Sequence, residues 1–293
     1  MPGLRRLCPA KVNLYLKVLG RRADGYHELV TVMQPLSLAD EVVITPAPVL
    51  SLRCSHPGVP EGPENLVWRA ATRLAEAVGR PAALHIHLHK RIPVAAGLGG
   101  GSSDAAGTLL ALNDLWGRPL EEAGLHQLAA ALGADVPFFL SGGPAVGRGI
   151  GTELSPLDLP PYWYVLLNPG LSLSTRWVYD QLDLPYLQRA GTPLRQAWEG
   201  EHPESWVGND LESVTLSRYP ELRELLRRVA ASGARAWGMS GSGPTLFGLF
   251  FSQEQAEAAA ARLRPHHRGW LAVARGLTRG ESERHWENQA WMI

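Results

Sequence analysis

The chain has 293 residues, with 28 basic and 28 acidic side chains and a formal net charge of +0. At roughly 150 residues per domain the length favours two domains, and 45% hydrophobic residues exclude a disordered chain. The balanced charge argues against a large surface for nucleic acid or anionic membrane, and we find neither a membrane-spanning apolar run nor a secretory leader, so we expect a cytoplasmic protein.

The first half of the chain is predicted to begin with strands and continue with helices. A strand is expected over residues 4–19, where apolar side chains alternate with others at positions 12, 14, 16 and 18. A polar turn that contains Asp24-Gly25 follows it. The pattern then predicts strands over residues 29–38, 41–45, 49–53 and 84–89, helices over 65–78, 102–115 and 120–132, and a hairpin over 145–154.

Residues 156–161 are rich in proline and lack a strand or helix pattern, which is typical of a linker. We therefore expect one domain over residues 1–155 and a second over residues 156–293. The pattern of the second half predicts strands over residues 162–167, 234–239, 245–250 and 270–274, and helices over 221–231 and 253–263. This order indicates an α+β fold rather than a doubly wound sheet.

A glycine-rich string, Pro-Val-Ala-Ala-Gly-Leu-Gly-Gly-Gly-Ser-Ser, occupies residues 93–103. Glycines let backbone N–H groups approach an anion closely, and the helix that follows offers unpaired N–H groups and a favourable dipole for phosphate. The alternative is an ordinary turn before a helix capped by a serine or by Asp104. The spacing fits neither a Walker A loop nor the dinucleotide-binding fingerprint.

The complete string resembles the phosphate loop of the GHMP kinases, a family named after galactokinase, homoserine kinase, mevalonate kinase and phosphomevalonate kinase. Two further family motifs are matched, Pro-Ala-Lys at residues 9–11 and Met-Ser-Gly-Ser-Gly-Pro-Thr at residues 239–245. The resemblance implies an ATP-dependent small-molecule kinase with two α+β lobes, an N-terminal ribosomal-protein-S5-like lobe and a C-terminal ferredoxin-like lobe. The third motif is expected to pack against the phosphate loop or to complete the substrate cleft.

Three other strings narrow the resemblance: Asp-Gly-Tyr-His at residues 24–27, Asn-Leu-Val-Trp-Arg-Ala at 65–70 and Gly-Ala-Asp-Val-Pro at 133–137. They are similar to family members that phosphorylate the 2-hydroxyl of a methylerythritol unit joined to cytidine diphosphate, in the non-mevalonate pathway to isoprenoid precursors. The resemblance implies that Asp135 is the candidate base and that Lys11 lies beside it. Such a cation would keep Asp135 ionised and stabilise charge that develops during phosphoryl transfer.

The same resemblance implies binding residues. On the substrate side these are Asn13, Tyr26, His27, Thr175 and Tyr179. The Tyr26 ring is expected to stack on the cytosine, the His27 imidazole to bond its edge, and Tyr179 to cover the other face. On the ATP side they are Asn65, Lys90, Pro93, Ala95, Gly97, Leu98, Gly99, Gly100, Gly101, Ser102 and Ser103. Mg²⁺ is expected as the counter-ion of ATP, with the Ser103 hydroxyl as its candidate ligand.

Other functions stay open at this point. A GHMP kinase for homoserine or mevalonate would share the glycine loops, but we would not expect it to carry Asp-Gly-Tyr-His. A catalytically silent nucleotide-binding protein on the same fold is disfavoured because Lys11 and Asp135 are both present. We expect no nucleic-acid or membrane partner, and a monomer or weak homodimer.

Lys11, Lys17 and Lys90 are the only lysines of this arginine-rich chain. If arginine is the default cation, the three lysines are candidates for tasks that need a compact ammonium. Lys11 and Lys90 fall in the predicted phosphoryl-transfer and ATP sites, whereas Lys17 lies in no motif and is expected to be solvated. Cys8 and Cys54 fit no metal or disulfide framework and are expected to be free thiols.

Overall fold

The computed structural model describes residues 3–191, 202–285 and 289–291. Its strands are β1 (Gly3–Arg21), β2 (His27–Pro46), β3 (Ser51–Cys54), β4 (Leu84–His89), β5 (Ala145–Arg148), β6 (Glu153–Pro156), β7 (Trp163–Asn168), β8 (Gly208–Asn209), β9 (Ala236–Met239), β10 (Leu246–Phe250), β11 (Trp270–Arg275) and β12 (Gln289–Trp291). Its helices are α1 (Leu66–Ala77), α2 (Gly100–Leu115), α3 (Glu122–Leu132), α4 (Val136–Leu140), α5 (Thr175–Asp180), α6 (Leu184–Ala190), α7 (Glu212–Arg218), α8 (Pro220–Ala231), α9 (Gln253–Leu263) and α10 (Arg279–His285).

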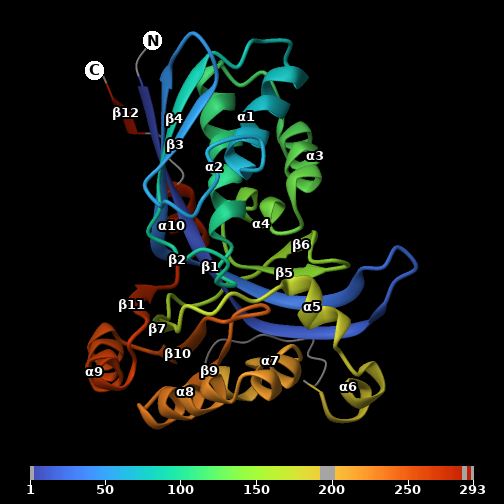
Figure 1. Ribbon diagram of the computed structural model, residues 1–293, viewed down its shortest axis with the longest axis vertical. Coiled ribbons are helices and arrows are strands. Elements are labelled where there is room, and N and C mark those ends of the chain that lie inside the picture. The colour runs from blue at the N-terminus through green and yellow to red at the C-terminus, as the bar shows by residue number, and fades with distance from the viewer. Residues whose placement is uncertain (1–2, 192–201, 286–288, 292–293) are drawn as a thin grey trace.

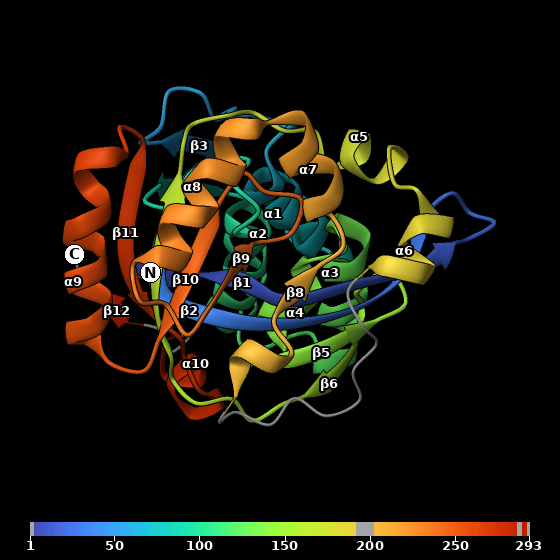
Figure 2. The same ribbon diagram turned by 90° about the horizontal axis from the view of Figure 1, so that it is seen from below.

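The long antiparallel pair β1 and β2 runs through the whole molecule. It leaves the upper lobe, bends beneath α4 and ends in a turn beside α5 and α6 (Figures 1 and 2). The register shifts between Pro9 and Lys11, between Asn13 and Tyr15, and between Val18 and Gly20. Such bulges increase twist and bend a strand. The bent hairpin can therefore pack against both lobes. The two strands predicted over residues 29–38 and 41–45 are therefore one strand, β2.

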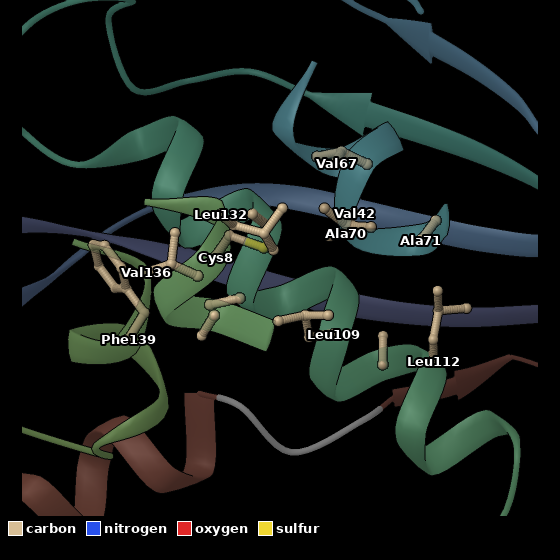
Figure 3. Packing of buried hydrophobic residues seen from close by; sticks show 14 of the residues in the cluster. Cys8, Val42, Val67, Ala70, Ala71, Leu109, Leu112, Leu132, Val136 and Phe139 are labelled. Atoms are coloured by element: carbon tan, nitrogen blue, oxygen red, sulfur yellow. The ribbon is translucent and has the colours of Figure 1, made fainter. Parts of the chain in front are cut away.

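The first lobe packs its helices on one face of a sheet with the order β12-β1-β2-β4-β3, and β5, β6 and β8 attach to this sheet. Its core is seen in Figure 3, where Cys8 and Val42 of the sheet lie among side chains of α1 and α2. The buried residues of α1 recur at helical spacing, Val67, Ala70, Ala71 and Leu74. The helix predicted over residues 65–78 is thus confirmed, with Asn65 as its N-cap.

The second lobe contains a sheet with the order β11-β7-β10-β9. All its strand pairs are antiparallel, and α7, α8 and α9 cover its outer face (Figures 1 and 2). The elements of this layer follow in the chain order β7, α8, β9, β10, α9 and β11, with α5, α6, β8 and α7 inserted before α8. This order is the ferredoxin-like arrangement. The predicted two-lobed α+β fold is therefore confirmed.

The chain returns to the first sheet after it has built the second. β8 pairs with β1 at Tyr15 and Leu16, and β12 pairs with β1 at residues 3–5, so the two termini lie side by side in Figure 1. The domain boundary between residues 155 and 156 stays a prediction. In the described residues, no helix combines the length and apolar character that a membrane crossing requires, and both cysteines are free.

Candidate active site

A pocket of about 730 Å³ lies where the β1–β2 hairpin meets the starts of α2, α4 and α5. This volume is typical of a small-molecule site. The residues of the predicted site that line it are Lys11, Asn13, Tyr26, His27, Ser102, Asp135, Thr175 and Tyr179. Arg21 and Arg176, which the sequence did not single out, line it as well. Residues more than a hundred positions apart in the chain thus meet in one cavity.

Lys11 and Asp135 form the charged centre of the pocket. Lys11 Nζ lies 3.4 Å from Asp135 Oδ2, and the side chains are 4% and 43% exposed. Asp135 stands at the N-cap position of α4 but makes no capping hydrogen bond with its side chain. Its carboxylate is therefore open to the pocket, with a buried ammonium beside it. This arrangement suits a base that accepts the proton of a hydroxyl nucleophile.

The side chain of Asn13 holds Lys11 in place. Lys11 Nζ donates a hydrogen bond to Asn13 Oδ1 at 2.5 Å, and Asn13 Nδ2 donates to Thr31 Oγ1 at 2.9 Å. The backbone N–H of Asn13 donates to Ser240 Oγ at 3.1 Å. Both ends of the amide are thus engaged within the protein. A direct contact of Asn13 with the substrate stays a prediction.

The phosphate loop ends in α2, which begins at Gly100, two residues earlier than predicted. The N-cap is Gly99 with φ 70°, and no side chain caps the helix. The N–H groups of the first turn are therefore left for an anion, as the loop composition predicted. The position of Asp104 predicts a helix cap, but Asp104 does not cap α2. Its carboxylate instead accepts a hydrogen bond from Lys90 Nζ at 2.7 Å.

The third glycine string packs directly on the phosphate loop. Ser240 Oγ donates to the Gly97 carbonyl at 2.8 Å, and Thr245 N–H donates to the Ala96 carbonyl at 3.3 Å. Gly97 has φ +75°, and a Cβ there would lie 2.2 Å from the Ser240 carbonyl oxygen. Only glycine permits this approach. Gly241 and Ser242 of the same string line the pocket. The expected packing against the phosphate loop is therefore found, and a part in the substrate cleft stays a prediction.

Most of the predicted ATP-binding residues lie outside this pocket, and Ser102 is the one that lines it. Asn65 caps α1: its Oδ1 accepts from the Val67 N–H at 2.8 Å and its Nδ2 donates to the Pro60 carbonyl at 2.7 Å. Ala95 is exposed on the loop with φ 52°. The contacts of Asn65, Lys90 and the loop residues 93–103 with ATP stay predictions.

Aromatic rings form one wall of the pocket. The rings of His27 and Tyr179 lie 5.1 Å apart between centroids with a tilt of 32°, and the Tyr26 side chain is 60% exposed. Burial, aided by the charge of Arg21, lowers the pKa of His27, which favours the neutral form of its ring. Burial and the charge of Asp135 raise the pKa of Tyr179. These uncharged rings suit the faces of a nucleobase.

Comparison with known proteins identifies the family. The model of the GHMP kinases N terminal domain matches residues 65–143, and that of the GHMP kinases C terminal region matches residues 188–267. A 4-diphosphocytidyl-2-C-methyl-D-erythritol kinase of Geobacter metallireducens is 46% identical over 277 residues, which cover 94% of this chain and 98% of the relative. The chain belongs to the GHMP kinase family. Members of this family are ATP-dependent phosphotransferases, and the protein is an enzyme of that kind.

Solved structures agree with this assignment. A crystal structure of 4-(cytidine 5'-diphospho)-2C-methyl-D-erythritol kinase matches with a TM-score of 0.76 and 43% identity, over 93% of this chain and 99% of the other. A homoserine kinase from Cytophaga hutchinsonii matches with a TM-score of 0.70 and 19% identity, over 95% of each chain. At that identity the second likeness concerns the fold alone.

A GHMP kinase uses ATP, and the pocket offers oxygen donors that fit Mg²⁺. Asp135, with a carboxylate, and Ser102, with a hydroxyl, line the pocket. Mg²⁺ commonly adds water and substrate phosphates to one or two protein ligands. Within the described residues, no three His, Cys, Asp or Glu side chains group as a metal site. The Ser103 hydroxyl is buried and has no hydrogen-bond partner among the residues that the structure describes. Its role as a ligand of Mg²⁺ stays a prediction.

Lys17 is not solvated, and that expectation was wrong. Its Nζ lies 3.5 Å from Asp210 Oδ2 with the lysine side chain 12% exposed, and it donates to the Leu187 carbonyl at 3.1 Å. The lysine thus joins β1 to α6 and to the segment before α7. No local pattern indicates this pairing, because Asp210 and Leu187 lie far along the chain from Lys17.

Proposed function

We propose that this GHMP kinase transfers the γ-phosphoryl group of ATP to the 2-hydroxyl of 4-diphosphocytidyl-2-C-methyl-D-erythritol, giving the 2-phosphate and ADP. The substrate is supported by the names of relatives that share 44–46% of their residues over about 94% of this chain. The observation that carries the proposal is that Lys11 and Asp135 line one pocket with Tyr26, His27 and Tyr179. A hydroxyl at the charged centre and a cytosine at the aromatic wall can then belong to one molecule.

In this proposal Asp135 accepts the proton of the attacking hydroxyl, and Lys11 stabilises charge on the reacting oxygens. The 3.4 Å separation leaves the two side chains close enough to act on the same atom. Lys11 is held by Asn13, so its position does not depend on the substrate. Phosphoryl transfer relies mainly on positioning and charge neutralisation, and these are what the pair provides.

The free N–H groups at the start of α2 hold the phosphates of ATP, and Ser102 brings this end of the helix to the substrate pocket. Mg²⁺, when bound with ATP, neutralises phosphate charge. Gly97 and Ser240 keep the loop against the second lobe. The rings of Tyr26 and Tyr179 cover the faces of the cytosine and His27 bonds its edge, while Thr175 and Asn13 border the middle of the substrate.

The substrate assignment is tested by ADP release with three acceptors under the same conditions. We expect turnover with 4-diphosphocytidyl-2-C-methyl-D-erythritol and none above background with homoserine or mevalonate. Turnover of homoserine or mevalonate alone would contradict the proposal. Retained ATP binding without turnover of any acceptor would instead favour the catalytically silent alternative.

We further propose that the enzyme acts in the cytoplasm, in isoprenoid precursor synthesis, as a monomer or weak homodimer without a nucleic-acid or membrane partner. The balanced charge of the chain supports the last point, since 28 basic residues face 28 acidic ones. A small phosphorylated ligand needs only a local cationic cleft. Sedimentation at micromolar concentration would test the oligomeric state.

A further inference from the structure

A buried charged cluster lies beneath the phosphate loop, outside the substrate pocket. It consists of Lys90, Asp40 and Asp104, which come from the end of β4, from β2 and from α2. Lys90 Nζ donates to Asp40 Oδ2 and, at 2.7 Å, to Asp104 Oδ2. The side chains are 5%, 0% and 2% exposed respectively. Charges buried this deeply are retained only where they are paired and hydrogen-bonded.

The cluster contacts both ends of the phosphate loop. On the entry side, Asp40 Oδ1 accepts hydrogen bonds from the backbone N–H groups of Arg91 at 2.5 Å and Ile92 at 2.9 Å. On the exit side, the bond from Lys90 reaches Asp104 in the second turn of α2. The residues between these two anchor points are the loop itself. Strand β4, after which the chain enters the loop, and helix α2, into which the loop leads, both belong to the first lobe in Figure 1.

The first residue of α2 rests on the cluster. A Cβ at Gly100 would lie 3.2 Å from Lys90 Nζ and 3.3 Å from Asp40 Oδ2. The cluster therefore lies directly beneath the backbone N–H groups that the proposed function assigns to the ATP phosphates. A shift of the cluster would move these groups.

The ionisation of each of the three groups depends on the other two. Burial opposes the charge of Lys90, but Asp104 and Asp40 outweigh burial and raise the pKa of Lys90. Burial raises the pKa of Asp104 to about 8, against the attraction of Lys90. Removal of Asp104 leaves Lys90 paired one-to-one with Asp40, whereas removal of Lys90 leaves two buried carboxylates without their cation. Substitution of Asp104 therefore breaks the hydrogen bond between Lys90 and α2 with the least damage to the fold.

We propose that Lys90, Asp40 and Asp104 are positioning residues that pin the two ends of the phosphate loop and so fix its N–H groups for ATP. The proposal rests on the proposed function in that the loop binds ATP phosphates. It assigns Lys90 a place under the loop, where its ammonium acts through Asp104 and Asp40. The substrate pocket, which the cluster does not line, is left unaffected.

Asp104→Ala tests the proposal through the binding of two ligands, measured by calorimetry without turnover. We expect the affinity for a nonhydrolysable ATP analogue with Mg²⁺ to fall about tenfold or more, the size of one hydrogen bond to a charged group. The affinity for cytidine diphosphate should stay within about twofold, a difference below 0.5 kcal/mol. Asp104→Asn keeps an oxygen that can accept from Lys90 Nζ and should recover most of the lost ATP affinity.

Asp114→Ala is the matched control, because Asp114 is in the same helix and pairs with a buried cation, Arg6, at 2.8 Å. Asp114 lies in the last turn of α2, far from the loop, so this variant should bind the ATP analogue like the wild type. If Asp104→Ala does not fold, Asp104→Leu, which better fills the space, carries the same prediction. Unchanged ATP affinity, equal loss of both ligands, no recovery with Asp104→Asn, or an equal loss in Asp114→Ala would overturn the proposal.

The two proposals fail in different ways. If ATP binding depends on Asp104 but 4-diphosphocytidyl-2-C-methyl-D-erythritol is not phosphorylated, the substrate assignment is wrong and the role of the cluster stands. If that substrate is phosphorylated and Asp104→Ala leaves the affinity for the ATP analogue unchanged, the cluster has no positioning role.

Discussion

At the scale of single residues, the Tyr179 ring can be tested by removing its aromatic face. Tyr179→Leu should raise KM for the cytidine substrate about 5- to 150-fold, because stacking on a base contributes roughly 1–3 kcal/mol. KM for ATP should change little. Tyr186→Leu is the control, since Tyr186 is 47% exposed and lies outside the pocket. Steady-state kinetics that showed equal effects of the two variants would remove Tyr179 from the cytosine site.

Tyr26 and His27 are predicted from a short string, and both line the pocket. The amide of Asn13 is engaged by Lys11 and Thr31, which no local pattern predicts. Lys17 is expected to be solvated, although it pairs with Asp210. Residue types are visible in the sequence, whereas partners from distant segments are supplied by the fold.

At the scale of elements, strands and helices with clear periodicity were predicted and irregular ones were not. The β2 strand was read as two because polar residues interrupt its apolar pattern near residue 40. Asp40 is nevertheless fully buried in that strand, because Lys90 and two backbone N–H groups pair with it. Helix α4 was missed because its five residues are too few for a periodic signal. Buried ion pairs and short helices are therefore what single-sequence patterns conceal.

The junction of the phosphate loop with the third glycine string can be tested at Gly97. Gly97→Ala would place a Cβ 2.2 Å from the Ser240 carbonyl oxygen at φ +75°. We expect a loss of at least about 1–2 kcal/mol of stability from the left-handed backbone alone, together with weaker ATP binding. Thermal unfolding and ATP-analogue titration measure both. Gly20→Ala, whose Cβ meets nothing within 4 Å, should leave both unchanged; the same result for Gly97→Ala would refute the predicted clash.

At the scale of the whole molecule, β1 and β2 make the two lobes one structure. One cluster of buried residues joins Val12 and Leu14 of β1 to Tyr164 and Phe247 of the second sheet. Because the lobes share this core, we expect them to unfold in a single cooperative transition. Circular dichroism and tryptophan fluorescence should then give coincident denaturation curves, and two separated transitions would contradict a shared core.

The stability of the molecule should also depend on Glu212 of α7. Burial raises the pKa of Glu212 to about 7, against the hydrogen bond that its carboxylate accepts from the Met239 N–H. The folded protein therefore holds this proton more tightly than the unfolded chain. Stability from this group is full below the ordinary pKa of 4.5, falls as pH rises towards 7, and stays low above it.

Glu212→Gln keeps the oxygen that accepts from Met239 and cannot ionise. Relative to the wild type, its free energy of unfolding should rise by about 1–2 kcal/mol between pH 5 and pH 8, since one pKa unit corresponds to about 1.4 kcal/mol and the side chain is only partly shielded from water. Urea denaturation at both pH values measures the difference. A pH-independent difference between the two proteins would show that Glu212 ionises normally.

The most direct test of the account is single-turnover phosphorylation of 4-diphosphocytidyl-2-C-methyl-D-erythritol by the wild type and by Asp135→Asn. Asparagine preserves the shape of the side chain but cannot take the hydroxyl proton. We predict a rate about 10²- to 10⁴-fold lower for Asp135→Asn, the usual contribution of a general base, with unchanged binding of an ATP analogue and of cytidine diphosphate. A rate equal to that of the wild type would contradict the central claim, because it would remove Asp135 from the mechanism.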